Sequence, residues 1–87
     1  MKIKCLNCGA SMVMVKEKYI CSNYNKGLRF RCKDRFTITP EQIQEILQDH
    51  NVNKDEVSEF KINKDHHYQI VMRDGTIKGY DGATIIV

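Results

Sequence analysis

The arrangement of the cysteines constrains this 87-residue chain more than any other feature. Cys5 and Cys8 are separated by two residues, so one tight turn can present both thiolates to a single ion. Gly9 follows directly and allows the positive φ that such a turn often needs. Cys21 and Cys32 are the other two cysteines of the chain. Four thiolates in this pattern are typical of a closed, tetrahedral zinc site, so we expect one structural zinc ion at Cys5, Cys8, Cys21 and Cys32.

Three other uses of the four thiols have to be weighed against zinc. Two disulfides would require an oxidising compartment, but residues 1–10 contain no apolar run like that of a signal peptide, and we expect a cytoplasmic protein with reduced thiols. A redox-active C-x2-C would normally open a helix, whereas residues 11–15 (Ser-Met-Val-Met-Val) have strand-like composition. An iron–sulfur cluster stays open as an alternative, because four thiolates suit it as well.

The size of the chain makes such a metal important. A domain of this length buries only about 60–65% of its unfolded surface, and with 41% hydrophobic residues and no tryptophan its core is modest. Zinc binding contributes roughly 10–16 kcal/mol of folding free energy in small finger peptides. No apolar stretch approaches the ~20 residues of a membrane span, so we expect no membrane partner.

The first part of the chain has the pattern of a zinc ribbon. Residues 11–15 are a candidate strand, residues 16–18 (Lys-Glu-Lys) a hairpin tip, and residues 19–21 the return strand that delivers Cys21 opposite the first turn. Residues 22–27 are rich in turn formers, and residues 28–32 alternate apolar and basic side chains with a period of two. We therefore predict a ribbon over residues 1–36.

A helix is predicted to open the second part, residues 37–87. Thr39 can cap it, Pro40 suits the first helical position, and Gln42 completes a capping box. Its apolar side chains share one face at helical spacing: Ile43, Ile46 and Leu47. We expect this face to pack on the ribbon or on a sheet, and Asn51 to close the helix in a left-handed conformation.

Strand patterns follow the helix to the end of the sequence. Strands are predicted at residues 60–63, 67–72, 76–80 and 83–87. Asp74-Gly75 and Asp81-Gly82 are two-residue hairpin signals between the last three of these strands. The expected fold is therefore small α+β: a four-cysteine zinc ribbon, one helix and a C-terminal antiparallel β-meander, packed together as one domain.

Charge is distributed unevenly between the two parts. Residues 1–36 contain nine basic and two acidic residues, a net charge of +7, whereas residues 37–87 contain five basic and nine acidic residues, a net charge of −4. A basic ribbon on an acidic remainder suggests a polyanionic partner for the first part. Lysine and arginine also protect exposed strand edges from aggregation, so charge alone leaves both interpretations open.

Residues 4–47 resemble the recombinase zinc β-ribbon of large serine recombinases and integrases. The matching features are Cys5-x2-Cys8-Gly9-Ala10 with Met12 shortly after, Tyr19-x-Cys21-Ser22-Asn23, the basic loop with Lys26-Gly27, Cys32, and Ile38-Thr39-Pro40-Glu41 at a helix start. The resemblance implies zinc at the four cysteines. It also implies DNA contact from the basic residues around the ribbon, which are Lys16, Lys18, Lys26, Arg29, Arg31, Lys33 and Arg35.

No constellation of catalytic residues is visible in the sequence. The acids show no paired spacing, the serines lack a recognisable base, and the glycines form no phosphate loop. The resolvase domain and the coiled-coil insertion that accompany the ribbon in the resembling family are not in this sequence, so strand transfer cannot be inferred from it. We also expect no small-molecule substrate. The leading hypothesis is a non-catalytic DNA-binding zinc ribbon; the alternative is a protein-interaction module of a phage or mobile element with a purely structural zinc.

Overall fold

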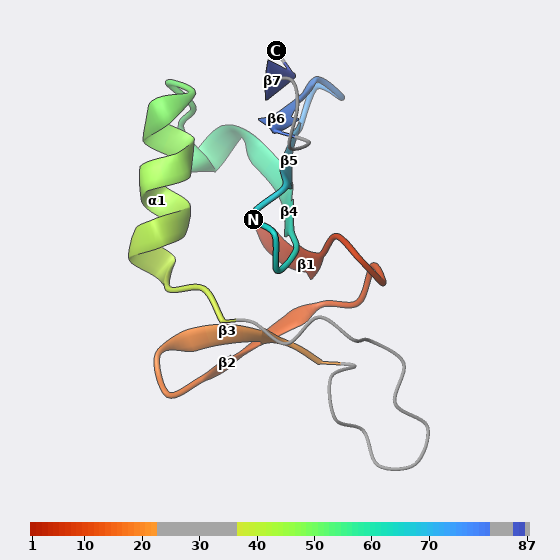
Figure 1. Ribbon diagram of the computed structural model, residues 1–87. Coiled ribbons are helices and arrows are strands. Elements are labelled where there is room, and N and C mark those ends of the chain that lie inside the picture. The colour runs from red at the N-terminus through yellow and green to blue at the C-terminus, as the bar shows by residue number, and fades with distance from the viewer. Residues whose placement is uncertain (23–36, 81–84, 87) are drawn as a thin grey trace.

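The computed structural model describes residues 1–22, 37–80 and 85–86, and within them the predicted small α+β fold is confirmed. A five-stranded sheet has the order β1-β4-β5-β6-β7, and a separate two-stranded sheet pairs β2 with β3. The strands are β1 (Lys2–Cys5), β2 (Met12–Val15), β3 (Lys18–Cys21), β4 (Val57–Ile62), β5 (Tyr68–Met72), β6 (Ile77–Tyr80) and β7 (Ile85–Ile86). The helix α1 (Pro40–Asp49) lies along one face of the larger sheet, and the β2–β3 hairpin lies beyond its end (Figure 1).

The predicted β-meander is present as β4 to β7, each strand antiparallel to the next. The expected two-residue turn at Asp74-Gly75 is wrong. The loop has three residues, because the Met72 amide donates to the Thr76 carbonyl at 2.8 Å and the Gly75 amide donates to the Met72 carbonyl at 3.0 Å. Of these loop residues only Gly75 has a positive φ, 92°, which is the geometry of a type I turn closed by a left-handed glycine.

Strand β1 joins the larger sheet as a parallel partner of β4, a pairing that the sequence analysis did not predict. Ile3 pairs with Phe60 and Cys5 pairs with Ile62, so the first cysteine stands at the end of a strand in the main sheet. The division into residues 1–36 and 37–87 stays a prediction, but this sheet and the core contain residues from both parts.

Helix α1 begins and ends as predicted. The Gln42 amide donates to the Thr39 hydroxyl at 3.2 Å, and the Gln42 side-chain oxygen accepts from the Thr39 amide at 2.9 Å, so the capping box is complete. Asn51 follows the helix with a φ of 53°. A short 3₁₀ helix (Lys54–Glu56), capped by the Asn53 side chain, then leads into β4.

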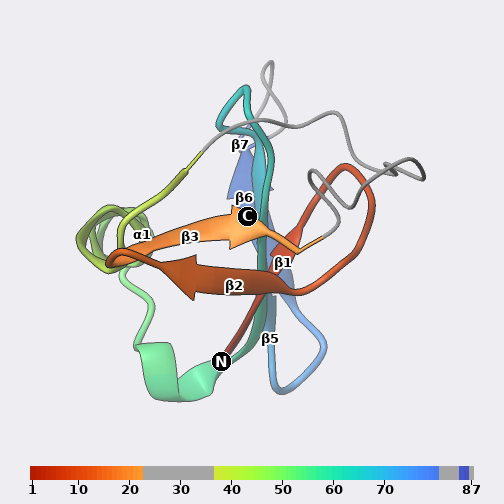
Figure 2. The same ribbon diagram turned by 90° about the horizontal axis from the view of Figure 1, so that it is seen from below.

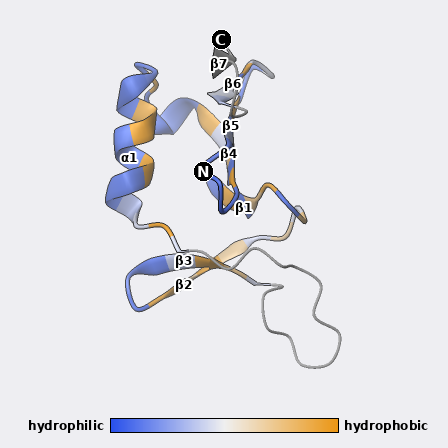
Figure 3. Ribbon diagram, viewed as in Figure 1, coloured by the Kyte–Doolittle hydropathy of each residue, from blue (hydrophilic) through white to orange (hydrophobic). Residues whose placement is uncertain are grey.

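The core lies between α1 and the larger sheet. Ile43 and Leu47 are buried on the helix, and Ile46 packs against the same cluster, as the apolar face predicted. Phe60 and Ile70 are fully buried on the facing strands. Figure 3 shows the hydrophobic bands of α1 turned toward the sheet. Since the helix face is occupied by the sheet in this way, it is a packing surface of the domain itself.

The β2–β3 hairpin carries Met12 and Cys21 into the same core, where both are buried. Its tip is formed by Lys16 and Glu17, with φ values of 50° and 66°. Two successive positive φ values are those of a type I′ turn, which matches the right-handed twist of the strands but favours Asn and Gly. Seen from below, the hairpin crosses the end of the larger sheet (Figure 2).

Candidate functional site

The first two cysteines lie on a turn between β1 and β2. The Gly9 amide donates to the Cys5 carbonyl and the Cys5 amide donates to the Ala10 carbonyl, both at 2.8 Å. Gly9 has a φ of 78°, so the glycine after Cys8 occupies the left-handed conformation that its position in the sequence suggested. The Leu6 amide donates to the Ile62 carbonyl at 2.9 Å and continues the β1–β4 ladder into this turn. The turn is therefore anchored on the main sheet.

The third cysteine reaches the same place from the hairpin. Cys21 is the last residue of β3 and pairs with Met12 at the start of β2. An isolated antiparallel bridge between Lys4 and Ser11 closes the Cys5–Cys8 turn at its base, and the Ser22 amide donates to the Ser11 carbonyl at 3.2 Å. The backbone pairs of the two sheets thus bring Cys21 to the Cys5–Cys8 turn.

The three sulfur atoms form a cluster suited to a metal ion. The Sγ atoms of Cys5, Cys8 and Cys21 all lie within 4.8 Å of one another, and those of Cys8 and Cys21 are 3.4 Å apart. Tetrahedral thiolates with a zinc–sulfur distance near 2.3 Å would be separated by roughly 3.8 Å, which lies between these two values. The three cysteines are close enough to coordinate a metal ion. Cys32, the predicted fourth ligand, lies outside the described residues.

Burial differs among the three cysteines. Cys5 and Cys21 have exposed fractions of 0% and 2%, whereas Cys8 is only partly buried. In the part of the chain that the structure describes, these three residues form the single group of three or more His, Cys, Asp or Glu side chains placed to share an ion. Cys5 belongs to the larger sheet and Cys21 to the hairpin, so an ion held here would link the two sheets.

Two of the seven predicted nucleic-acid-binding residues lie in described parts of the chain. Lys16 at the hairpin tip and Lys18 at the start of β3 are both exposed. The other five lie outside the described residues: Lys26, Arg29, Arg31, Lys33 and Arg35.

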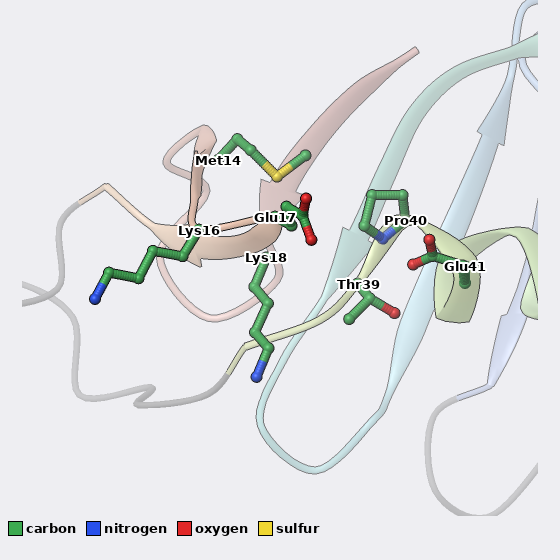
Figure 4. A pocket seen from close by; sticks show the side chains of 7 residues that line it. All are labelled: Met14, Lys16, Glu17, Lys18, Thr39, Pro40 and Glu41. Carbon is green, nitrogen blue, oxygen red and sulfur yellow. The ribbon is translucent and has the colours of Figure 1, made fainter.

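A shallow open depression of about 430 Å³ separates the hairpin tip from the start of α1. Figure 4 shows the Lys16 ammonium group pointing away from the helix and the Lys18 ammonium group pointing downward in the view, with the Glu17 and Glu41 carboxylates between hairpin and helix.

Strand β2 adds an apolar surface next to these lysines. Val13, Met14 and Val15 are exposed by 44%, 49% and 51% of their surface. The apolar composition of residues 11–15 predicts a strand but not the exposure of its side chains, because an apolar β-strand is expected to be buried on at least one face. Contiguous exposed apolar residues on a strand often mark a contact surface for another protein.

The outer face of the larger sheet, opposite α1, carries a group of charges that the sequence analysis missed. Lys4 on β1 pairs with Glu59 on β4 at 2.8 Å, and Lys61 lies 3.9 Å from the other Glu59 oxygen. The hydrogen bond from Lys4 lowers the pKa of the Glu59 carboxyl below its ordinary value. The parallel β1–β4 register brings Lys4 beside Glu59, and no local pattern signals that pairing.

A second group missed from the sequence links α1 to the sheet. The His50 Nε2 atom lies 2.8 Å from the Tyr68 hydroxyl, and the Tyr68 ring stacks on Phe60 at a centroid distance of 6.0 Å. Burial raises the pKa of Tyr68, and the nearby Asp49 carboxylate raises it further. This contact joins the C-terminal end of the helix to β5.

Comparisons of the chain with protein-family models, with curated proteins and with solved structures find no match. The resemblance to the recombinase ribbon thus depends on the sequence motifs alone. Among the described residues, no helix is long and apolar enough to cross a bilayer.

Proposed function

We propose that the chain is a non-catalytic zinc protein that binds DNA through the basic surface of its ribbon. The observation that carries the metal part of the proposal is the convergence of three cysteine sulfurs, from β1, its following turn and β3, within 4.8 Å. Cys32 is proposed as the fourth ligand because it is the one remaining thiol of the chain. Four protein ligands leave no open position, which suits a structural rather than a catalytic zinc.

The role of the ion follows from the elements that it would join. Within the described residues, two isolated backbone bridges join the β2–β3 hairpin and its flanks to the rest of the protein: Lys4–Ser11 and Tyr19–Ile38. A zinc ion shared by Cys5 and Cys21 would hold the hairpin in one orientation on the main sheet. A rigidly held hairpin can place basic side chains along a phosphate backbone at a lower entropic cost than a mobile one.

The DNA part of the proposal is supported by charge. The first 36 residues have a formal net charge of +7, which four thiolates around one zinc ion would reduce to about +5, and the described lysines of the hairpin are exposed. Lysine and arginine on phosphates supply most of the affinity of non-specific DNA binding, and each contact releases counterions. We therefore expect binding that weakens steeply as salt is raised.

Fluorescence anisotropy with a labelled DNA duplex, measured on the zinc-loaded protein over a salt series, tests this proposal. Each phosphate contact contributes about −0.9 to the slope of log K against log salt. The double variant Lys16→Ala, Lys18→Ala should reduce the slope by up to about 1.8 if both lysines contact phosphate. Lys54→Ala, an exposed lysine in the acidic part, is the matched control and should leave the slope unchanged.

Charge reversal at the other predicted contacts extends the test. Arg29→Glu with Arg31→Glu should abolish binding at moderate salt. The DNA proposal is lost if the zinc-loaded wild type shows no binding at low salt, or if the Lys54→Ala control weakens binding as much as the hairpin and arginine variants do.

The second candidate function is a protein-interaction module with the same structural metal, and the exposed apolar residues of β2 favour it. Val13→Lys with Val15→Lys would disrupt such an interface while adding positive charge to the ribbon. DNA binding should then persist or strengthen, whereas capture of a stoichiometric, nuclease-insensitive protein partner should be lost. If the wild type recovers such a partner and binds no DNA, this function replaces the first.

A further inference from the structure

The unequal burial of the clustered cysteines has a chemical consequence. Among the described cysteines, Cys8 is the one that an oxidant from solvent meets first, because Cys5 and Cys21 are almost completely buried and Cys8 is only partly so. The sulfur atom of Cys21 is 3.4 Å from that of Cys8, whereas a disulfide requires about 2.05 Å. The two sulfur atoms therefore have to approach each other only a short way to form a disulfide. Cys8 lies on a turn rather than within a strand, so its backbone is not held in a strand ladder.

We propose that Cys8 is a hydroperoxide-sensitive site and that Cys21 resolves its oxidation, so that the metal centre is also a redox switch. The inference rests on the proposed metal site, since it concerns the same thiolates. Susceptibility of a cysteine to peroxide follows thiolate character and exposure. Metal binding requires the thiolate form of all the cysteine ligands. Among the described ligands, Cys8 is the one whose thiolate is also partly exposed to solvent.

The reaction balances with a hydroperoxide as the only oxidant. The Cys8 thiolate attacks one peroxide oxygen, the O–O bond breaks, and hydroxide leaves, which produces a sulfenic acid at Cys8. The Cys21 thiolate then attacks the Cys8 sulfur, an S–S bond forms, and the sulfenic oxygen leaves as a second hydroxide that takes up a proton as water. Both hydroxides take up a proton from solvent, so two thiolates have been oxidised by two electrons in all and one hydrogen peroxide has been reduced to two molecules of water.

The structural result of this disulfide is loss of the metal. Two of the four proposed ligands are consumed, and two remaining thiolates cannot retain the ion in a closed site. Cys5 on β1 and Cys21 on β3 would no longer share an ion, and the Cys8–Cys21 disulfide would replace the ion as the link between the anchored turn and the hairpin. A dithiol reductant with added zinc should restore the metal centre.

The test uses the zinc-loaded, full-length chain. Hydrogen peroxide is added at low excess, zinc release is followed with a chromogenic chelator, and disulfides are located by proteolysis and mass spectrometry without reduction. We expect one zinc ion released for each disulfide formed, a Cys8–Cys21 bridge as the main product, and recovery of zinc binding after treatment with dithiothreitol. Because the exposed Met14 also oxidises, Met14→Leu serves as a control and should release zinc in the same way.

A ligand-preserving variant separates reactivity from coordination. Cys8→His retains a nitrogen ligand for zinc but has no sulfur at this position, so it should keep its zinc in peroxide that empties the wild type. A bridge that involves Cys5 or Cys32 instead of the Cys8–Cys21 pair would overturn the inference, and so would zinc retention by the wild type. Those results would leave the proposed zinc site intact, whereas a purified reduced protein without zinc would refute the site itself.

Discussion

Removal of a single thiolate at Cys5 offers the sharpest test of the metal centre. Cys5 has two roles in the structure: its sulfur belongs to the cluster, and its fully buried side chain packs in the core beside Ile62. A loss of stability in Cys5→Ala could therefore come from either role. Measuring thermal unfolding in zinc and in a metal chelator separates them, because only the ligand role depends on the ion.

The expected magnitudes follow from mass action. Free zinc at 1,000 times its dissociation constant stabilises a folded protein by about 4 kcal/mol, and in a domain of this size each 1 kcal/mol shifts the midpoint by roughly 4–8 °C. The chelator should thus lower the wild-type midpoint by roughly 15–30 °C. In Cys5→Ala this shift should nearly vanish, because three remaining thiolates bind zinc too weakly to saturate at the same free concentration.

The control is Ile62→Val, which alters the same part of the core without touching a ligand. It should cost about 1 kcal/mol in both conditions and leave the zinc-dependent shift at its wild-type size. The reasoning is refuted if Cys5→Ala loses the same stability in zinc and in chelator. Cys5 would then be a core side chain, and its place in the sulfur cluster would be incidental.

Three further predictions test the surrounding fold by urea unfolding monitored by circular dichroism. Thr39→Ala removes the hydroxyl that accepts from the first turn of α1 and should cost about 1 kcal/mol, with Thr39→Ser close to wild type; equal losses in both would contradict the capping role. Gly79→Ala places a Cβ 2.2 Å from the Tyr68 carbonyl oxygen, so it should destabilise by at least about 1–3 kcal/mol, and a neutral result would refute this close approach of β6 and β5. Hydrogen bonds from Thr76 hold the pKa of Asp74 below its ordinary value of 3.8. The stability that these hydrogen bonds give the folded state is therefore present above the ordinary pKa and is lost as the pH falls through the lower pKa of folded Asp74. Asp74→Asn should consequently show a weaker acid dependence of unfolding than the wild type. Identical acid profiles of the two proteins would contradict this prediction.

The sequence alone determined the parts of the fold that depend on neighbours along the chain. The Cys5–Cys8 turn, the capping box at Thr39 and Gln42, and the left-handed Asn51 follow from local rules of backbone geometry and hydrogen bonding. The antiparallel strands were also predictable, because alternation and turn residues reveal them within ten residues or so. The Asp74-Gly75 signal located a turn but gave its length wrongly, since the same residues suit two-residue and three-residue loops.

Only the tertiary structure decided how these parts meet. The parallel pairing of β1 with β4 joins residues more than fifty positions apart, and no local pattern encodes such a partner choice. That pairing places Cys5 on the main sheet and unites Lys4 with Glu59. The tertiary structure also decides that Met12 of β2 is buried and that Val13, Met14 and Val15 are exposed. The sequence determined which atoms can hold an ion, because thiolate chemistry is a property of the residue. Which elements that ion would join depends on the burial of apolar surface between distant strands and the helix, and this is decided only when the whole chain is folded.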